Sequence, residues 1–73
     1  MISFMDQFRA MERRRKSARI TSEELAEEAG VSAVTLSRWR NNKQRPTVDG
    51  WAVVIRALER LIVKRAMELE DLK

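Results

Sequence analysis

The sequence has no cysteine, histidine or tyrosine, and only one proline and two glycines in 73 residues. Without cysteine and histidine it has no disulfides, no zinc-finger ligand sets and no thiolate or imidazole catalysis. It also lacks a glycine-rich phosphate loop and a carboxylate pair distinct from ordinary helix surface, so we do not expect an enzyme. No cofactor, metal ion or small-molecule ligand is expected. A chain of this length holds one small core, which needs close helix packing, self-association or both.

Long hydrophobic runs are missing as well. No apolar stretch approaches the roughly 20 residues that a membrane-spanning helix needs. The N-terminus lacks the order of charged, apolar and small residues that marks a signal peptide. The absence of cysteine is compatible with a reducing compartment, so we expect a cytoplasmic protein without a membrane partner.

The net charge of +4 is unevenly distributed along the chain. Residues 1–20 carry six bases and two acids, residues 21–29 carry four glutamates and no base, and residues 30–47 carry four bases and no acid. Residues 48–73 are balanced, with five of each. This layout predicts a polarised surface with one face that attracts polyanions. Ordinary solvated helix faces are the alternative, but they do not explain 30–47, where no acid accompanies the bases.

Helices are expected throughout, because glycine and proline are rare and no run alternates with a period of two. Ser3 is the expected N-cap of a first helix that ends near Arg19. Thr21, with Glu24 three residues later, has the pattern of a capping box at the start of a second helix. The fold class is therefore predicted to be all-α.

A tight turn is predicted around Gly30, between two capped helices. Gly30 ends the second helix because glycine adopts the left-handed conformation at little steric cost. Ser32 caps a third helix that ends at Asn41–Asn42. Thr47 caps a fourth helix, which begins at Val48 after an extended link.

The third helix is predicted to have one buried and one free face. Val31, Leu36 and Trp39 anchor it on the core, which makes Trp39 a core residue rather than a base-stacking one. This arrangement specifies a helix-turn-helix, whose second helix enters the major groove of DNA. The predicted partner is double-stranded DNA, and the predicted base-contacting residues are Ser32, Ala33, Val34, Thr35, Ser37 and Arg38.

Each predicted contact has a plainer alternative. Arg38 is suited to bidentate contact with guanine O6 and N7, and the small residues beside it can touch thymine methyl groups. The alternatives are that Arg38 is an ordinary solvated side chain and that the small residues have no role beyond forming the helix. The Arg13–Lys16 run fits two interpretations equally well: contacts with phosphates, or the solvent-exposed face of the first helix. The polar residues near the helix ends are predicted to contact phosphates. The alternative is that they are only the polar residues that any exposed loop carries. The predicted phosphate-contacting residues are Thr21, Ser22, Arg40, Asn41, Asn42, Lys43, Gln44 and Arg45.

The text "ITSEELAEEAGVSAVTLSRWRNNKQRPT", continuing into "VDGWAVVIRAL", resembles the lambda-repressor-like, or Cro/C1-type, helix-turn-helix family. The resemblance covers about residues 8–58 and implies a compact bundle of four or possibly five helices. It also implies a sequence-specific transcription regulator, commonly dimeric, that reads the major groove with helix 32–41. The letters "SRWR" are also similar to the CII activator of phage lambda. A phage or bacterial repressor or activator is thus expected, with an antitoxin-type interaction protein on the same scaffold as the alternative.

Three positions depart from the family's pattern. Arg40 stands where family members often carry an acid that pairs with an arginine of the first helix, so Arg15 needs another partner or stays solvated. Glu59 stands where many members have a glycine that breaks the fourth helix. Ala33 and Val34 stand where glutamine is common and cannot make its hydrogen bonds.

The fourth helix is expected to run without a break to the end of the chain. Trp51, Ile55, Leu58 and Ile62 form a stripe that can close the core. The chain is then a single domain, 1–73, in which 59–73 is a helical extension used for self-association as a homodimer or homotetramer. A frayed, solvated tail is the alternative. The residues predicted for the interface are Val54, Leu58, Leu61, Ile62, Leu69 and Leu72.

Overall fold

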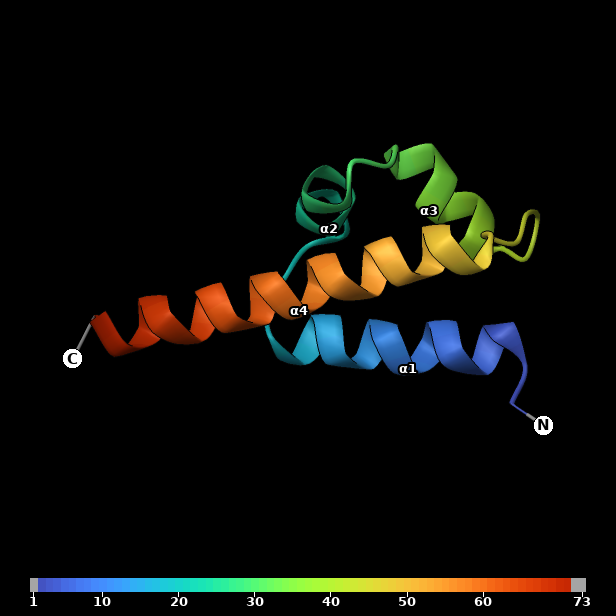
Figure 1. Ribbon diagram of the computed structural model, residues 1–73. Helices are drawn as coiled ribbons and strands as arrows, with labels where there is room; N and C mark the ends of the chain where they lie inside the picture. The colour runs from blue at the N-terminus through green and yellow to red at the C-terminus, as the bar shows by residue number, and fades with distance from the viewer. Residues whose placement is uncertain (1, 72–73) are drawn as a thin grey trace.

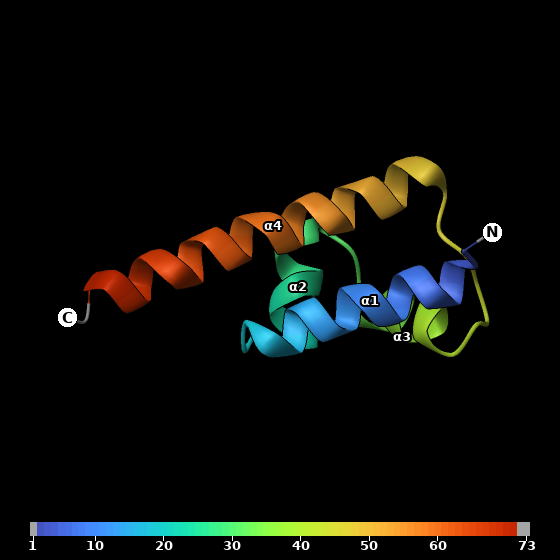
Figure 2. The same ribbon diagram turned by 90° about the horizontal axis from the view of Figure 1, so that it is seen from below.

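Four α-helices follow one another in the computed structural model, which describes residues 2–71. They are α1 (Phe4–Ser17), α2 (Ser22–Ala29), α3 (Ala33–Arg40) and α4 (Val48–Asp71). α1 and α4 run in the same general direction, and the short α2–α3 pair covers them (Figures 1 and 2). The all-α prediction is confirmed, with four helices in the described part of the chain.

The predicted N-caps are all in place. Thr21 and Glu24 form a reciprocal capping box in which each side chain accepts the other residue's backbone N–H at 3.1 Å. Ser3 forms a similar box with Asp6, a partner that the sequence analysis did not name. The Thr47 hydroxyl accepts the N–H of Gly50 at 2.9 Å where α4 begins. The end of α1 was placed slightly late, since the helix stops at Ser17 rather than near Arg19.

Gly30 makes the turn between α2 and α3. Its backbone lies in the left-handed region, with φ 72° and ψ 26°. The N–H of Val31 donates to the carbonyl of Ala26 at 3.0 Å, and the N–H of Gly30 donates to that of Glu27 at 3.2 Å. These bonds satisfy carbonyls that the end of a helix leaves open, and the chain turns from α2 into α3 through the three residues 30–32.

The core lies where all four helices meet. Its buried side chains are Phe8, Met11, Ile20, Leu25, Ala26, Leu36, Trp39, Val54, Ala57 and Leu58. Trp39 is thereby confirmed as a core residue, and its ring lies 6.4 Å from that of Trp51, edge to face. Such edge-to-face contacts between aromatic rings add stabilisation beyond that from burying the rings.

The burial of α4 corrects one part of the sequence analysis. Val54 and Leu58 were placed on a self-association surface, but both are completely buried within the chain. Leu58 was also placed in the stripe that closes the core, and that prediction is confirmed. α2 packs along α4 and covers this stripe, while Trp51, Ile55 and Ile62 are only partly buried. Of the residues predicted for the interface, Leu61 and Ile62 are half-buried, Leu69 is exposed, and Leu72 lies outside the described residues.

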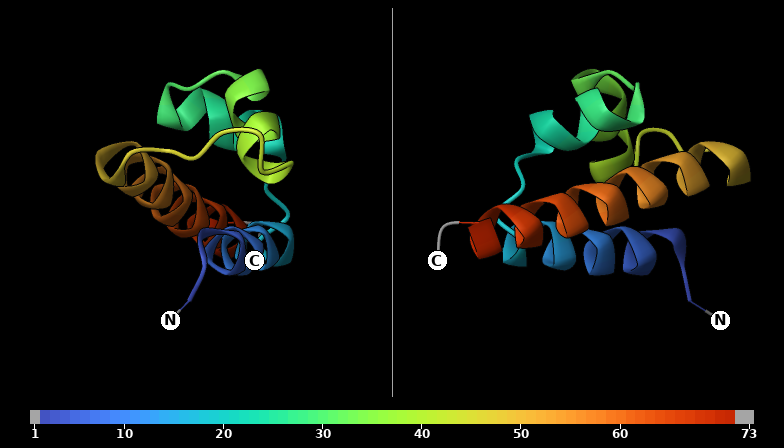
Figure 3. Two further views of the ribbon diagram at one scale, coloured as in Figure 1. Left: turned by 90° about the vertical axis from the view of Figure 1, so that its right-hand side faces the viewer. Right: turned by 60° about the vertical axis from the view of Figure 1, so that its left-hand side comes forward.

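α4 continues beyond the other helices at its C-terminal end. α4 is 24 residues long, and its C-terminal part projects past the end of α1 (Figures 1 and 3), which contributes to the overall dimensions of 42 × 26 × 19 Å. Val63, Met67 and Leu69 are well exposed on this extension. None of the described helices is both long and apolar enough to cross a membrane.

We expect Gly30→Ala to lower the free energy of unfolding by about 1–2 kcal/mol. A Cβ at Gly30 would meet no atom within 4 Å, so the whole cost comes from the left-handed backbone. Gly30→Asn is the matched comparison, because asparagine tolerates this conformation better than alanine. Urea unfolding followed by circular dichroism measures both, and an alanine variant as stable as the parent would contradict the prediction.

Candidate nucleic-acid interface

α2, the turn at Gly30 and α3 form a helix-turn-helix whose second helix exposes one side. Leu36 and Trp39 are buried beneath α3, while Ala33, Val34 and Arg38 are exposed. Ser32, the N-cap of α3, is exposed too, and Thr35 and Ser37 are half-buried at the edges of the same face. All six predicted base-contacting residues are therefore at least partly exposed on α3 or at its N-cap, and their contacts with bases stay a prediction.

The loop after α3 is held against the end of that helix by its own backbone. The N–H of Lys43 donates to the carbonyl of Arg38 at 2.8 Å, and that of Asn42 donates to Trp39 at 3.1 Å. Asn42 adopts a positive φ of 56° there. Five consecutive side chains of this loop are exposed: Asn41, Asn42, Lys43, Gln44 and Arg45. These hydrogen bonds hold the start of the loop, as far as Lys43, in a defined place beside α3.

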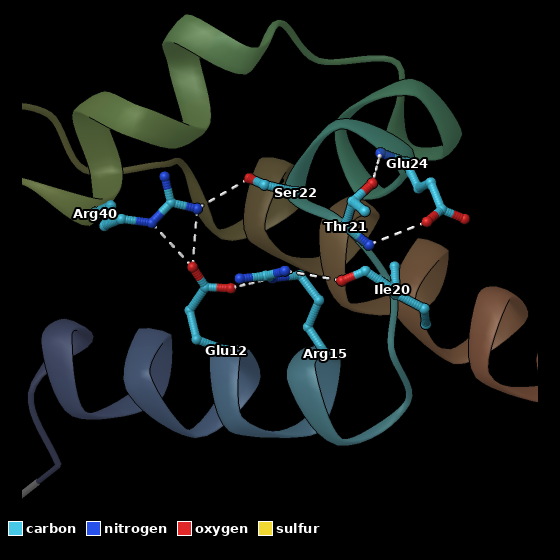
Figure 4. A network of polar contacts seen from close by, with 7 residues as sticks. All are labelled: Glu12, Arg15, Ile20, Thr21, Ser22, Glu24 and Arg40. Carbon is cyan, nitrogen blue, oxygen red and sulfur yellow. Dashed lines mark hydrogen bonds and ion pairs between the residues drawn. The ribbon is translucent and has the colours of Figure 1, made fainter.

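The start of α2 lies close to the end of α3. Thr21 is exposed, and its hydroxyl is already used in the capping box. The Ser22 hydroxyl accepts a hydrogen bond from Nη2 of Arg40 at 2.9 Å (Figure 4). Ser22 is thus within reach of the last residue of α3, whereas the start of α2 lies some way from the loop that follows α3 (Figure 1).

Glu12 of α1 links three elements through its carboxylate (Figure 4). One oxygen accepts from Nε of Arg15. The other accepts from Nε of Arg40 at 2.9 Å and lies 2.8 Å from its Nη2. Arg15 also donates from Nη1 to the carbonyl of Ile20 at 2.8 Å, in the link before α2. The carboxylate therefore ties the end of α3 to α1 and to the chain that enters α2.

Glu12 is a residue of this site that was not predicted from the sequence. It supplies another partner for Arg15, the first of the two outcomes predicted for that residue. It also holds Arg40, which stands where the resemblance led us to expect an acid. The spacing of Glu12 and Arg15, three residues apart, fits a helical ion pair. The contact with Arg40 crosses 28 residues of sequence and had no local pattern to indicate it.

Arg40 is only partly available to another molecule. Its Nε and Nη2 are held by Glu12 and Ser22, and its Cζ lies 5.8 Å from the centre of the Phe8 ring. The third guanidinium nitrogen, Nη1, makes no hydrogen bond with any described residue. The side chain is 39% exposed. The phosphate contact of Arg40 stays a prediction, for which Nη1 is the nitrogen left without a partner among the described residues.

The Arg13–Lys16 run divides into two kinds of side chain. Arg15 is buried, whereas Arg13, Arg14 and Lys16 are exposed. The buried arginine serves the packing of α1 against the link to α2. Only the other three remain candidates for an external ligand.

The carboxyl groups of Glu12 and Glu24 both have lowered pKa values. For Glu12, burial alone would raise the pKa, but the hydrogen bonds and charges of Arg15 and Arg40 outweigh it and hold the pKa below the ordinary 4.5. The pKa of Glu24 is lowered first by the backbone N–H of Thr21, and further by Arg65, whose Nη2 lies 2.5 Å from Oε2 of Glu24. Among the described residues, no group of acidic side chains is placed to hold a metal ion.

A family model described as helix-turn-helix matches residues 11–60, which is more than half of the chain. The chain belongs to the Cro/C1-type helix-turn-helix family. The match runs from α1 through the recognition helix into α4, and it supports a DNA-binding helix-turn-helix regulator. Neither the curated proteins nor the solved structures gave a match to this chain. The comparisons do not confirm the resemblance to the CII activator.

We expect Glu12→Gln to lower the free energy of unfolding by roughly 2–3 kcal/mol at pH 7, because two arginines lose their charged partner. The loss is smaller than for a fully buried pair because Arg40 stays partly hydrated. In the parent, this contribution is complete above pH 4.5 and disappears as the pH falls through the lowered folded pKa. The difference between parent and variant should therefore shrink in acid.

Urea unfolding at pH 7 and near pH 3 measures that difference. Glu59→Gln is the matched control, since Glu59 is an exposed acid of α4 that forms no ion pair within the described residues. A Glu12→Gln variant as stable as the control at pH 7, or a difference that stays the same in acid, would contradict the assigned role.

Proposed function

We propose that this protein is a sequence-specific transcription regulator of phage or bacterial type that reads the major groove with α3. The observation that supports this best is the exposed face of α3, which stands beside a fixed cationic loop and carries no acid. Small side chains at Ala33 and Val34 allow the helix backbone to approach the base edges closely. Repression and activation use the same surface, and the proposal includes both.

Arg38 is assigned the main polar contact with a base. Its side chain is exposed at the middle of the free face, with no ion-pair partner among the described residues. A guanidinium in that position can donate two hydrogen bonds to guanine O6 and N7. Ser32, Ala33, Val34, Thr35 and Ser37 would contact neighbouring bases, with Ala33 and Val34 suited to thymine methyl groups.

The loop and the start of α2 are assigned to the phosphate backbone. Asn41, Asn42, Lys43, Gln44 and Arg45 are exposed directly beyond the recognition helix, so they would fix its register along the duplex. Thr21 and Ser22 would contribute from α2. Arg40 would mainly hold α3 against α1, with Nη1 alone directed to a phosphate.

Selection of bound DNA from random duplexes tests the function as a whole. We expect enrichment of one short sequence motif, with a guanine at the position that Arg38 contacts. Retention of DNA without any enriched sequence would rule out a sequence-specific regulator. A palindromic motif would further show that two copies bind together.

We expect Lys43→Ala and Arg45→Ala to weaken binding to all duplex sequences to a similar extent. Each should also reduce the slope of log K against log salt by about one unit, because one fewer counterion is released. Lys64→Ala, which removes an exposed lysine from the far part of α4, is the matched control and should leave the slope unchanged. Unchanged slopes in both loop variants would remove Lys43 and Arg45 from the interface.

We expect Arg38→Ala to weaken binding to the selected site by about 1–3 kcal/mol and to relax the preference at one base pair. Binding to random duplex should change far less, because base contacts contribute little to it. Arg56→Ala, at an exposed arginine of α4, controls for the loss of one positive charge. Equal losses on selected and random DNA would show that Arg38 touches only the backbone.

A further inference from the structure

The extension of α4 and the C-terminal half of α1 border an open groove that lies apart from α3. Its floor is apolar: Ala18 stands directly after α1, and Ile62, Ala66 and Leu69 lie along α4. Toward the middle of α1 the groove continues past Ala10. The two helices run side by side here, and the end of α4 passes the end of α1 (Figures 1 and 3).

All the charged side chains that line this groove in the described part of the chain are basic. They are Arg13, Arg14, Arg19 and Arg65. Arg65 is half-buried and pairs with Glu24 of α2. The other three are exposed and form no ion pair within residues 2–71. An apolar floor bordered by such cations is complementary to a ligand that is apolar along its middle and acidic along its edges.

The floor has the spacing of a helix–helix contact. Ile62, Ala66 and Leu69 follow one another by four and three residues, which places them on one face of α4. Ala66 is small and stands between two larger side chains, so another helix can approach closest at that position. Leu69 is 60% exposed, which leaves apolar surface for a ligand to cover. A helix laid in the groove would pack against α1 and α4 at once.

We propose that this groove binds an acidic amphipathic helix of another protein. The apolar face of that helix covers Ile62 and Leu69, and its carboxylates pair with Arg13, Arg14 and Arg19. Burial of apolar surface and attraction between opposite charges then act in the same direction. In Figure 1 α1 lies on one side of α4 and the α2–α3 pair on the other, so the groove stays open when α3 is bound to DNA. The proposal does not depend on the proposed function.

Two other occupants fit the groove less well. A second copy of this chain, paired groove to groove, would bring two sets of arginines together. A DNA duplex would neutralise the arginines, but its phosphates would leave the apolar floor uncovered. Each of these occupants gives a different result in the experiments below.

The other apolar side of the α4 extension provides a control surface. Val63 and Met67 are exposed there, among Arg56, Arg60 and Lys64. Every residue that lines this side belongs to α4, so a partner helix would pack against one helix instead of two. An acid, Glu59, also lies among its cations. This side therefore offers similar residue types without the groove.

Fluorescence anisotropy of a labelled peptide tests the site. The probe is an alanine-based helix of about 20 residues, long enough to be helical alone, with leucines four and three residues apart and glutamates beside them. A second peptide carries lysine in place of each glutamate. We expect the full chain to bind the glutamate peptide with a dissociation constant on the order of 10–100 μM, and the lysine peptide at least about tenfold more weakly. No binding of the glutamate peptide at several hundred micromolar, or equal binding of the two peptides, would overturn the proposal.

A matched pair of double variants locates the acidic edge of the peptide. We expect Arg13→Ala/Arg14→Ala to weaken binding of the glutamate peptide about fivefold, because it loses two exposed ion pairs. Arg56→Ala/Lys64→Ala removes the same charge from exposed positions on the control surface and should weaken binding less than about twofold. Equal losses in the two variants would mean that net charge alone attracts the peptide, which contradicts a site in the groove.

A second matched pair locates the apolar face. Leu69→Gln should weaken the glutamate peptide severalfold, because the floor loses apolar surface. Met67→Gln should leave the affinity unchanged, although Met67 is also 60% exposed on the same helix. All four substituted arginine, leucine and methionine positions are exposed, so the helical circular dichroism signal of the chain should stay the same. A larger loss with Met67→Gln than with Leu69→Gln would place the peptide on the wrong side of α4.

Two further measurements distinguish the other occupants. Binding to random duplex should be almost the same for Arg13→Ala/Arg14→Ala and for its matched control. A loss confined to the α1 variant, with peptide binding intact, would assign these arginines to DNA and overturn the proposal. Sedimentation of the full chain with and without the glutamate peptide tests for a second copy. A dimer that the peptide dissociates would show that the chain itself fills the groove, and this result would also overturn the proposal.

Discussion

The carboxylate of Glu12 is the interaction on which the position of the recognition helix depends. It holds Arg40 at the end of α3 and Arg15 in α1, and Arg15 holds the carbonyl of Ile20 before α2. Apolar packing would still draw these helices together, but it is non-directional. The charged hydrogen bonds are directional, and they fix how α3 is turned relative to α1. The exposed face of α3 is defined by that orientation.

This network also explains how the chain tolerates an arginine after Trp39. Family members often place an acid there and an arginine on the first helix. Here Arg40 supplies the cation from α3 and Glu12 supplies the anion from α1, so opposite charges still meet at the same junction. Arg15, which would otherwise be a buried cation without a partner, pairs with the same carboxylate. One acid thus serves two arginines, and the positive charge left over lies with the partly exposed Arg40.

Local features of the fold were predictable from the sequence, and distant ones were not. The caps at Ser3, Thr21, Ser32 and Thr47 each involve a residue and the one three positions later, so they can be recognised in the amino-acid sequence. The same holds for Gly30. The face that α4 buries depends on where α2 lies against it. Val54 was therefore predicted on a free surface, and Leu58 both in the core stripe and on that surface, although both residues belong to the core.

The candidate interface likewise has features that local sequence predicts and features that depend on distant residues. The exposure of Ala33, Val34 and Arg38 followed from the helical period once Leu36 and Trp39 were assigned to the core. The hydrogen bonds that engage part of the Arg40 guanidinium did not follow from the helical period, because they depend on Glu12, which lies 28 residues away in the sequence. The base sequence that α3 recognises depends on contacts in a complex, and the order of residues in the chain does not specify it.

The unbroken course of α4 has a consequence for geometry. Glu59 lies within a continuous helix, so no hinge separates the part of α4 that supports α2 and α3 from the part that extends beyond them. In a rigid helix of this kind, length and rotation are linked. Each added residue lengthens the helix by about 1.5 Å and rotates everything beyond it by about 100° about the helix axis. Anything bound to the far end of α4 is therefore held at one distance and one rotation from the recognition helix, and a single inserted residue changes both.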